Sequence, residues 1–408
     1  MSDVIPEGTT TSKELFFVRE SSCGEIESDP DYKRFSDNWV SSDTTISANK
    51  EKQRGASGPD AVEIRSGSEN STFTVSYHLQ RWLSDSTADP LNDAFTRTND
   101  DSNKLPNSHG LYEITKRANG GAGGSGIYTY TIGKGAKAST ATITLDSSTG
   151  IPVVAEIEYQ VQKLRSYQID QPESDGTLDI TSTSDDDTMD IDLEDDASGS
   201  TQETVTLTGT TTATTTSSFS NLRGALLASA PKGDVTVSDS DGNTLLTIRG
   251  SNSYPPGYTG DRGVPTVGNG SFESALGNSY YIYRGDAIDR PSGTALDDNI
   301  IDASWEVDNN IETDTHGSDQ KLTIHEGNRD LTFSATIHGT TASHDKIDDL
   351  LIGQENAIRW VADSANSQNL QLEEAERMND ATRARNESDA KMTLDVEYSG
   401  TGLTVDAS

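Results

Sequence analysis

Hydrophobic and polar residues alternate in short runs along most of the chain, and this period of two is typical of half-buried strands. The runs are rich in Thr, Val, Ile and Tyr, which favour strands. They lie at 73–77, 127–132, 141–145, 205–207, 235–237 and 392–396. Asp241-Gly242-Asn243 stands between two strand-like runs and predicts a hairpin turn. The pattern as a whole predicts a mainly β protein.

Helical spacing of apolar residues is rare. The best stretch is 343–353, where Ile347, Leu350 and Leu351 fall on one face and Gly353 offers a stop. A weaker, polar stretch runs from Leu370 to Ala384, and a short apolar stretch at 79–83 is a further helix candidate. We therefore expect a few short helices among many strands.

One segment of the chain recurs. Residues 72–78 (TFTVSYH) match residues 332–338 (TFSATIH) at a constant offset of 260. Further matches follow in the same order: 17–19 with 282–284, Trp39 with Trp305, and 157–159 with 396–398. Thr-rich strands resemble one another by composition alone, so chance similarity is the alternative. The shared order favours two homologous β modules.

The matches divide the chain into three parts. We predict a first β module with an N-terminal arm at 1–165 and a second module at 278–408, each a sandwich or barrel with short helices. The intervening residues 166–277 differ in texture, with an acidic run at 185–196, a Thr/Ser tract at 208–218 and a strand pair of their own. We expect this part to be a small inserted β domain that projects outward.

The sequence is strongly acidic. The chain has 31 Lys and Arg against 67 Asp and Glu, a formal charge of -36, and only 31% of its residues are hydrophobic. Carboxylates interrupt good strand patterns, as at 153–159, whereas disorder would place them in segments without periodicity. We interpret this composition as that of an extreme halophile's protein, because in molar salt the screening length falls to about 3 Å.

Composition also excludes several classes. No basic stripe exists to neutralise phosphates, which argues against wrapping nucleic acid. No apolar run approaches the roughly 18 residues of a spanning helix. The single cysteine, Cys23, forbids an internal disulfide. The first residues have neither the basic start nor the apolar core of a secretory signal, so we expect the product to stay in the cytoplasm of the cell that makes it.

Candidate chemistry is sparse. Residues 121–126 formally fit a dinucleotide fingerprint, but a strand pattern follows where a helix is required. Asp239-Ser240-Asp241-Gly242 resembles part of a calcium loop, but Val237 occupies the first ligand position. The acidic run at 185–196 is typical of a solvated loop, with calcium binding as the less favoured alternative. The six histidines include no zinc motif.

We therefore predict no catalytic, cofactor-binding or metal-binding residue and no enzymatic activity. A pair of glycosidase carboxylates far apart in the sequence is the open alternative.

In layout, the two modules resemble the tail tube (major tail) proteins of tailed viruses and phages. The resemblance is carried by a polar N-terminal arm, a long loop after Trp39 (40–60), a strand at 71–77, a short apolar helix candidate and a terminal Tyr-containing strand. It implies β-sandwich or barrel modules whose sheets join across subunits into an inner barrel. Rings of six such modules would stack into a hollow tube, with the arm and the long loop bridging to the next ring.

The resemblance also implies a function. A duplicated chain would complete the six-module ring as a trimer, and the tube would pass viral DNA without binding it specifically. The expected partners are copies of the chain itself and the tape-measure, terminator and baseplate proteins, with no membrane and no cofactor. The product would lie in the virion tail after assembly in the host cytoplasm.

Two alternatives remain open. One is another virion component, such as a baseplate or head-decoration protein. The other is a cell-surface or surface-layer protein. This alternative is suggested by the Thr/Ser tract and by the glycosylation-like triplets at Asn70, Asn269 and Asn386.

Overall fold

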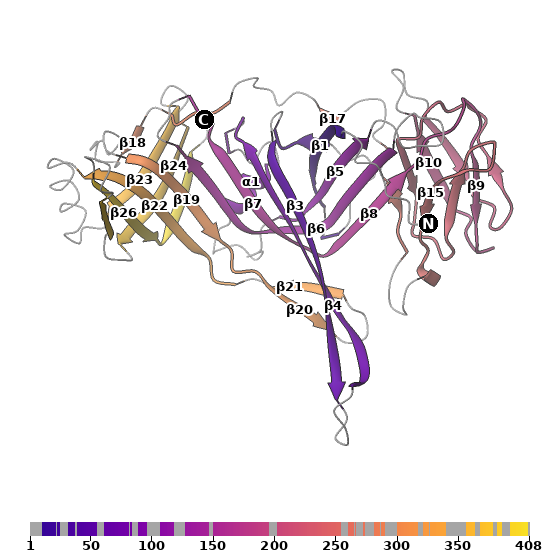
Figure 1. The fold of residues 1–408 in the computed structure, drawn as a ribbon, viewed down its shortest axis with the longest axis horizontal. Coiled ribbons are helices and arrows are strands. Elements are labelled where there is room, and N and C mark those ends of the chain that lie inside the picture. The colour runs from indigo at the N-terminus through magenta and orange to yellow at the C-terminus, as the bar shows by residue number, and fades with distance from the viewer. Residues whose placement is uncertain are drawn as a thin grey trace.

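The structure is a computed structural model of the 408-residue chain. It describes residues 10–21, 23–24, 32–36, 39–54, 61–80, 82–83, 89–95, 107–117, 127–146, 150–195, 202–253, 260–264, 266, 272–273, 281–285, 287–289, 300–316, 321–325, 327–339, 356–363, 368–377, 382–385 and 392–406. The protein is mainly β, as the alternating pattern predicts, and nearly all its strand pairs are antiparallel (Figure 1).

The N-terminal part is a two-layered sandwich. One layer has the order β2-β1-β5-β6-β8, with bounds Tyr32–Arg34, Thr10–Arg19, His109–Arg117, Ile127–Leu145 and Lys163–Ile169. The other layer has the order β3-β4-β7-β6, in which β3 is Trp39–Arg54, β4 is Ala61–His78 and β7 is Val154–Val161.

Strand β6 belongs to both layers because it bends between them. Its first half pairs with β5 and β8, and its second half pairs with β7. Gly135 lies at the bend with φ +63°, and a Cβ there would stand 2.7 Å from the side chain of Gln162. Only glycine adopts this conformation at so close an approach without strain.

Helix α1 (Pro90–Phe95) closes the core of this sandwich. Asp89 caps the helix by accepting a hydrogen bond from the Leu91 amide (2.9 Å), and proline is favourable at the first helical position. The apolar stretch at 79–83 was expected to be helical, but its described residues are irregular. Leu79, Trp82 and Leu83 are buried all the same and belong to the hydrophobic core.

The C-terminal part is a second two-layered sandwich. One layer has the order β18-β23-β24-β27, with bounds Ala287–Asp289, Asn356–Asp363, Gln368–Arg377 and Gly402–Asp406. The other has the order β19-β22-β26-β25, with bounds Ile300–Asp308, Asp330–Gly339, Met392–Gly400 and Thr382–Arg385. A hairpin of β20 (Glu312–His316) and β21 (Lys321–His325) separates β19 from β22.

The helix expected from Leu370 to Ala384 is wrong, because its described residues lie in strands β24 and β25. Leu370 and Leu372 point into the core at 0% and 1% exposure, a spacing of two that suits a strand paired on both sides. The helix expected at 343–353 and the glycine-rich loop at 121–126 lie outside the described residues.

The recurring segments occupy matching places in the two sandwiches. Phe73 of β4 lies opposite Tyr159 of β7, and Phe333 of β22 lies opposite Tyr398 of β26. The matching of the two tryptophans is wrong. Trp305 lies opposite Phe333, and the residue opposite Phe73 is Thr44 rather than Trp39. The match of 17–19 with 282–284 is also wrong. Residues 17–19 lie in strand β1, whereas residues 282–284 lie in irregular chain before β18.

The two sandwiches are joined edge to edge. Strand β19 pairs with β6 in register from Ala303 opposite Leu145 to Asp308 opposite Thr140. This pairing makes one continuous eight-stranded sheet, β3-β4-β7-β6-β19-β22-β26-β25, which we call the joint sheet. A single hydrophobic core runs beneath it, where Trp82 contacts Trp360 from the other sandwich with ring centroids 5.3 Å apart.

Residues between the sandwiches form a third, smaller β-sandwich. One sheet has the order β12-β9-β14-β15, with bounds Ala213–Thr214, Asp179–Ser182, Val235–Ser238 and Thr244–Ile248. The other has the order β11-β10-β13-β16, with bounds Gln202–Thr206, Asp190–Glu194, Gly224–Leu227 and Gly263–Val264. A short 3-10 helix, η2 (Ser251–Ser253), follows β15, and β17 (Phe272–Glu273) returns to pair with β2. The hairpin predicted at Asp241-Gly242-Asn243 is confirmed.

This inserted sandwich, which we call the insert, packs on the layer β2-β1-β5-β6-β8 of the first sandwich. Figure 1 shows the insert at one end of the molecule and the second sandwich at the other. Its core is continuous with aromatic residues of that layer, including Phe16, Tyr112 and Tyr130. The Tyr130 hydroxyl donates to the Arg223 carbonyl at 2.6 Å, and the Lys163 ammonium lies 2.7 Å from the Asp261 carboxylate. The insert therefore covers the face of the sandwich that lies away from the joint sheet.

Candidate assembly surface

The joint sheet has one apolar face and one polar face. Alternate residues of each strand are buried in the core, as Val75, Ile157 and Phe333 are at 0–2% exposure. Their neighbours along the strand point the other way because successive side chains alternate. We call this second surface the polar face.

Carboxylates and hydroxyls make up most of the polar face. Nine carboxylates lie on it: Asp43, Glu156, Glu158, Asp302, Glu306, Asp308, Asp330, Asp395 and Glu397. Ser and Thr occupy most places between them, and no Lys or Arg occurs in 41–45, 72–78, 139–145, 154–161, 300–308, 330–339 or 392–400. The carboxylates of the face therefore have no Lys or Arg within these segments to offset them, although β25 at one end of the sheet carries Arg383 and Arg385.

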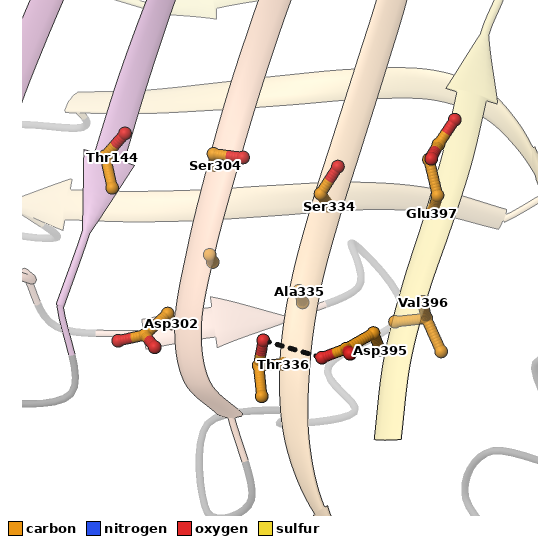
Figure 2. A pocket seen from close by; sticks show the side chains of 10 residues that line it. Thr144, Asp302, Ser304, Ser334, Ala335, Thr336, Asp395, Val396 and Glu397 are labelled. Atoms are coloured by element: carbon orange, nitrogen blue, oxygen red, sulfur yellow. Dashed lines mark hydrogen bonds between the residues drawn. The ribbon is translucent and has the colours of Figure 1, made fainter. Parts of the chain in front are cut away.

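The polar face is hollowed near the middle of the joint sheet. Figure 2 shows the hollow across β6, β19, β22 and β26, lined by Thr144, Asp302, Ser304, Ser334, Asp395 and Glu397 among others. Thr336 donates to Asp395 at 2.9 Å across two strands. The hollow is open to solvent, and its lining has the chemistry of a wetted, acidic wall.

The two ends of the joint sheet are edges. Among the described strands, β3 pairs only with β4, and β25 pairs only with β26. Ser41, Asp43, Thr44 and Thr45 of β3 are exposed. Unpaired edges are templates for further strand pairing, and folded proteins normally protect them.

Two hairpins extend from the joint sheet on the same side (Figure 1). The loop expected at 40–60 is wrong in its described part, because β3 and β4 stay paired from Trp39 opposite Tyr77 to Arg54 opposite Ala61. This β3–β4 hairpin continues about nine residues beyond the last pair of β4 with β7, or about 30 Å at 3.4 Å per residue. The β20–β21 hairpin of the second sandwich contacts β4.

A buried ionic cluster holds α1 against strands β1 and β5. The Asp93 carboxylate lies 3.0 Å from His109 Nε2 and accepts hydrogen bonds from Arg19 and from Asn107 (3.0 Å). Burial alone would raise the pKa of Asp93, but His109 and Arg19 outweigh it and hold the pKa below its usual value. Phe17 and Tyr159 pack against His109, so the Asp93–His109 pair is buried and structural, while Arg19 and Asn107 reach the solvent.

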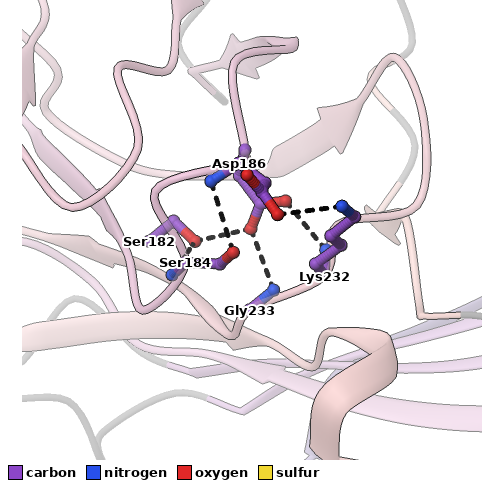
Figure 3. A network of polar contacts seen from close by, with 6 residues as sticks. Ser182, Ser184, Asp186, Lys232 and Gly233 are labelled. Carbon is purple, nitrogen blue, oxygen red and sulfur yellow. Dashed lines mark hydrogen bonds and ion pairs between the residues drawn. The ribbon is translucent and has the colours of Figure 1, made fainter.

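The acidic run at 185–196 is a solvated loop only at its start, where Asp185 and Asp186 are exposed in a turn. Asp190, Asp192 and Glu194 lie in strand β10, where Asp190 and Asp192 accept hydrogen bonds from threonines of β11 at 2.6 Å. Asp187 is 1% exposed and accepts hydrogen bonds from the Ser182 hydroxyl and from the amides of Lys232 and Gly233 at 2.6–2.9 Å. Figure 3 shows these three donors, together with the neighbouring Asp186, whose carboxylate lies 2.9 Å from the Lys232 ammonium. The donors to Asp187 are protein groups, so Asp187 ties two turns of the insert together.

The other residues considered from the sequence do not come together in one site. Asp239 accepts hydrogen bonds from the amides of Asp241 and Asn243, as a turn residue does. Burial lowers the pKa of Lys134 to about 8, with help from the charges of Lys163 and Arg262, at the joint between the insert and the first sandwich. Within the described ranges, no group of three or more His, Cys, Asp and Glu is placed to hold a metal ion.

Sequence reasoning singled out no site residue and missed the polar face and the two edges. The sequence does show carboxylates that alternate with core residues, as at 153–159. These carboxylates form one surface only because strands about 160 residues apart in the sequence pair with each other, and the sequence pattern does not reveal that pairing. No described helix has the length and apolar character needed to cross a membrane.

The fold and the polar face define a mainly β protein with an acidic sheet face that has an edge strand at each end among the described strands. No model of a known protein family matches the chain, and no curated protein matches it significantly.

Proposed function

We propose that this chain is a structural subunit of a viral tail tube, built as a duplicated tail-tube module and adapted to high salt. The observation that carries the proposal is the joint sheet. Two like sandwiches share it, both of its ends are edge strands, and its polar face is acidic and hollowed. A ring of such sheets pairs both ends of every joint sheet, which protects these edge strands from pairing with other chains.

The proposed stoichiometry combines the duplication with the resemblance to tail tube proteins, which implies rings of six modules. Each chain supplies two modules, so three chains in a closed ring supply six. Closed cyclic symmetry is the usual way for head-to-tail contacts to end without forming an open fibre. The ring proposed here is therefore a homotrimer with the joint sheets as its inner wall.

The acidic polar face suits the bore of such a ring. Like charges repel DNA phosphates, so the nucleic acid passes without binding. The insert packs on the layer away from the polar face, which places it on the outside of the proposed tube. The β3–β4 hairpin extends about 30 Å beyond the sheet, enough to contact a neighbouring ring.

Under this proposal the protein has no enzymatic role and acts through assembly. Its partners are its own copies and the tape-measure, terminator and baseplate proteins, with viral DNA in transit, and its location is the virion tail.

Electron microscopy of the purified chain in multimolar salt tests the proposal. We expect rings or tubes with an open bore, and three copies per ring by mass measurement. Particles that stay monomeric in every salt and concentration tried would overturn it. Copy number in virions separates a tube subunit, which is abundant, from a baseplate or decoration protein.

A further inference from the structure

We infer that the exposed edge of β3 pairs antiparallel with β25 of a second copy of this chain, with Thr45 opposite Thr382 and Asp43 opposite Ala384. The inference rests on the proposed function and deepens it by naming the edges and the register that join the copies. It comes from a contact within the chain that already shows how such modules join.

The contact between β6 and β19 is the template. It joins the last strand of the first module's half of the joint sheet to the first strand of the second module's half. Strand β3 is the counterpart of β19, because both begin their module's half of the joint sheet and pair with the recurring segment. Strand β25 is likewise the counterpart of β6, because both pair with the terminal Tyr-containing strand.

The register follows from these counterparts on the β3 side. Thr45 lies opposite Thr72, and Glu306 lies opposite Thr332, which is the match of Thr72 at the offset of 260. Thr45 therefore occupies the place of Glu306.

On the β25 side, Thr142 lies opposite Glu156, three residues before Tyr159. Thr382 lies opposite Asp395, three residues before Tyr398. Because Tyr159 and Tyr398 both lie opposite the recurring phenylalanine, Thr382 occupies the place of Thr142.

Within the chain, Glu306 lies opposite Thr142. The same pairing between two copies places Thr45 opposite Thr382, and two residues along antiparallel strands it places Asp43 opposite Ala384. Among the described strands β3 pairs only with β4, and Thr44 is exposed although it lies opposite the fully buried Phe73, so the core is uncovered at this edge. The edge therefore accepts the same kind of strand that β19 accepts from β6.

Disulfide trapping tests the register. In a Cys23→Ser background, the variant Asp43→Cys with Ala384→Cys is oxidised under the salt conditions that give rings. Opposite residues on antiparallel strands have Cα atoms about 4.5–5.5 Å apart, within the range of a disulfide. The two positions lie at opposite ends of an eight-stranded sheet, about 34 Å apart at 4.8 Å per strand, so a cross-link must join two chains.

The expected result is a reducible ladder of covalent dimers and trimers. A matched control pairs Asp43→Cys with Thr382→Cys, which shifts the register by two residues and should cross-link at least tenfold less. Single-cysteine variants and unfolding curves check specificity and folding. Without any substitution, amide exchange at 41–45 and 382–385 should slow when rings form.

The outcomes separate the two proposals. Rings that form while the control pair links better, or while exchange at both edges stays fast, overturn the inferred register and leave the tube standing. Absence of rings in the unsubstituted chain overturns the tube, and the inference with it.

Discussion

At the scale of single residues, the buried cluster around Asp93 is the most consequential polar contact of the first sandwich. Its carboxylate is 4% exposed and His109 is 1% exposed, whereas Arg19 keeps 27% of its side chain in solvent. Removing the charge takes the Asp93 carboxylate away from both Arg19 and His109 in a place that is largely desolvated. We expect Asp93→Asn to cost about 3 kcal/mol, the lower end of the range for breaking a buried pair, because solvent reaches Arg19.

The pH dependence of this loss has a definite sign. The pKa of Asp93 is lower in the folded than in the unfolded chain, so its contribution is full above the ordinary carboxyl pKa and is lost as pH falls through the folded value. The gap in unfolding free energy between the unsubstituted chain and Asp93→Asn should be wide at pH 7, begin to shrink below about pH 4, and close only as pH falls through the lower folded pKa. Denaturant unfolding across this range measures it, with the exposed Asp43→Asn as control. A gap that does not vary with pH would contradict the assignment.

Two hydroxyls of the core should respond oppositely to deletion. The Tyr159 hydroxyl is buried with no hydrogen-bond partner among the described residues, so Tyr159→Phe should be neutral or stabilise by up to about 1 kcal/mol. The Ser182 hydroxyl donates to the buried Asp187 carboxylate, so Ser182→Ala should destabilise by about 1–2 kcal/mol. Denaturant unfolding of both variants compares them. Destabilisation by Tyr159→Phe would show that its hydroxyl has a partner after all.

At the scale of elements, alternation identified the strands better than their ends or partners. Runs such as 73–77 and 141–145 lie in strands because one side of each is buried. The stretch 370–384 misled because its exposed positions carry Glu and Gln, which also favour helices. The hairpin at 46–54 was missed for a related reason. It leaves the sheet, so no core imposes a period of two on its sequence.

The candidate surface was harder to predict than the strands. Its residues come from strands up to 350 positions apart, and a sequence pattern does not report which edges meet. The tryptophan match failed because a single matched residue, without an alternating pattern around it, fixes no register: Trp39 begins β3 and Trp305 lies within β19. The match of 72–78 with 332–338 carried information, since its core positions alternate in phase and fix both cross-strand pairs.

The β3–β4 hairpin should govern stacking without affecting the ring. Deleting residues 49–68 and joining Ala48 to Glu69, which lie opposite each other, through Asn-Gly keeps the register of the part that packs on β7. We expect the shortened chain to fold and to form rings but to lose long tubes, as seen by electron microscopy. Replacing 317–320 of the β20–β21 hairpin by Gly and Ser residues keeps its length and is the control. Tubes of unchanged length from the shortened chain would exclude a stacking role.

At the scale of the whole molecule, the charge of -36 sets the conditions for assembly. Closing a ring brings several polar faces together, and their carboxylates repel across the bore. At 0.1 M salt the screening length is about 10 Å, whereas at 1 M it is about 3 Å. We therefore expect rings to loosen on dialysis into dilute buffer and to reform when molar salt is restored, as followed by light scattering and microscopy.

Neutralising the hollow of the polar face should lower the salt needed for assembly. The variant Asp302→Asn, Asp395→Asn, Glu397→Gln removes three carboxylates where copies face one another in the proposed ring. A matched control removes three exposed carboxylates from the insert, Glu173→Gln, Asp175→Asn and Asp241→Asn, which lie on the outside of that ring. We expect the salt midpoint of assembly to fall several-fold for the first variant and to change little for the second, because repulsion between distant surface charges is screened within about a Debye length. Equal shifts in both variants would mean that net charge alone, rather than the charge of the polar face, opposes ring closure.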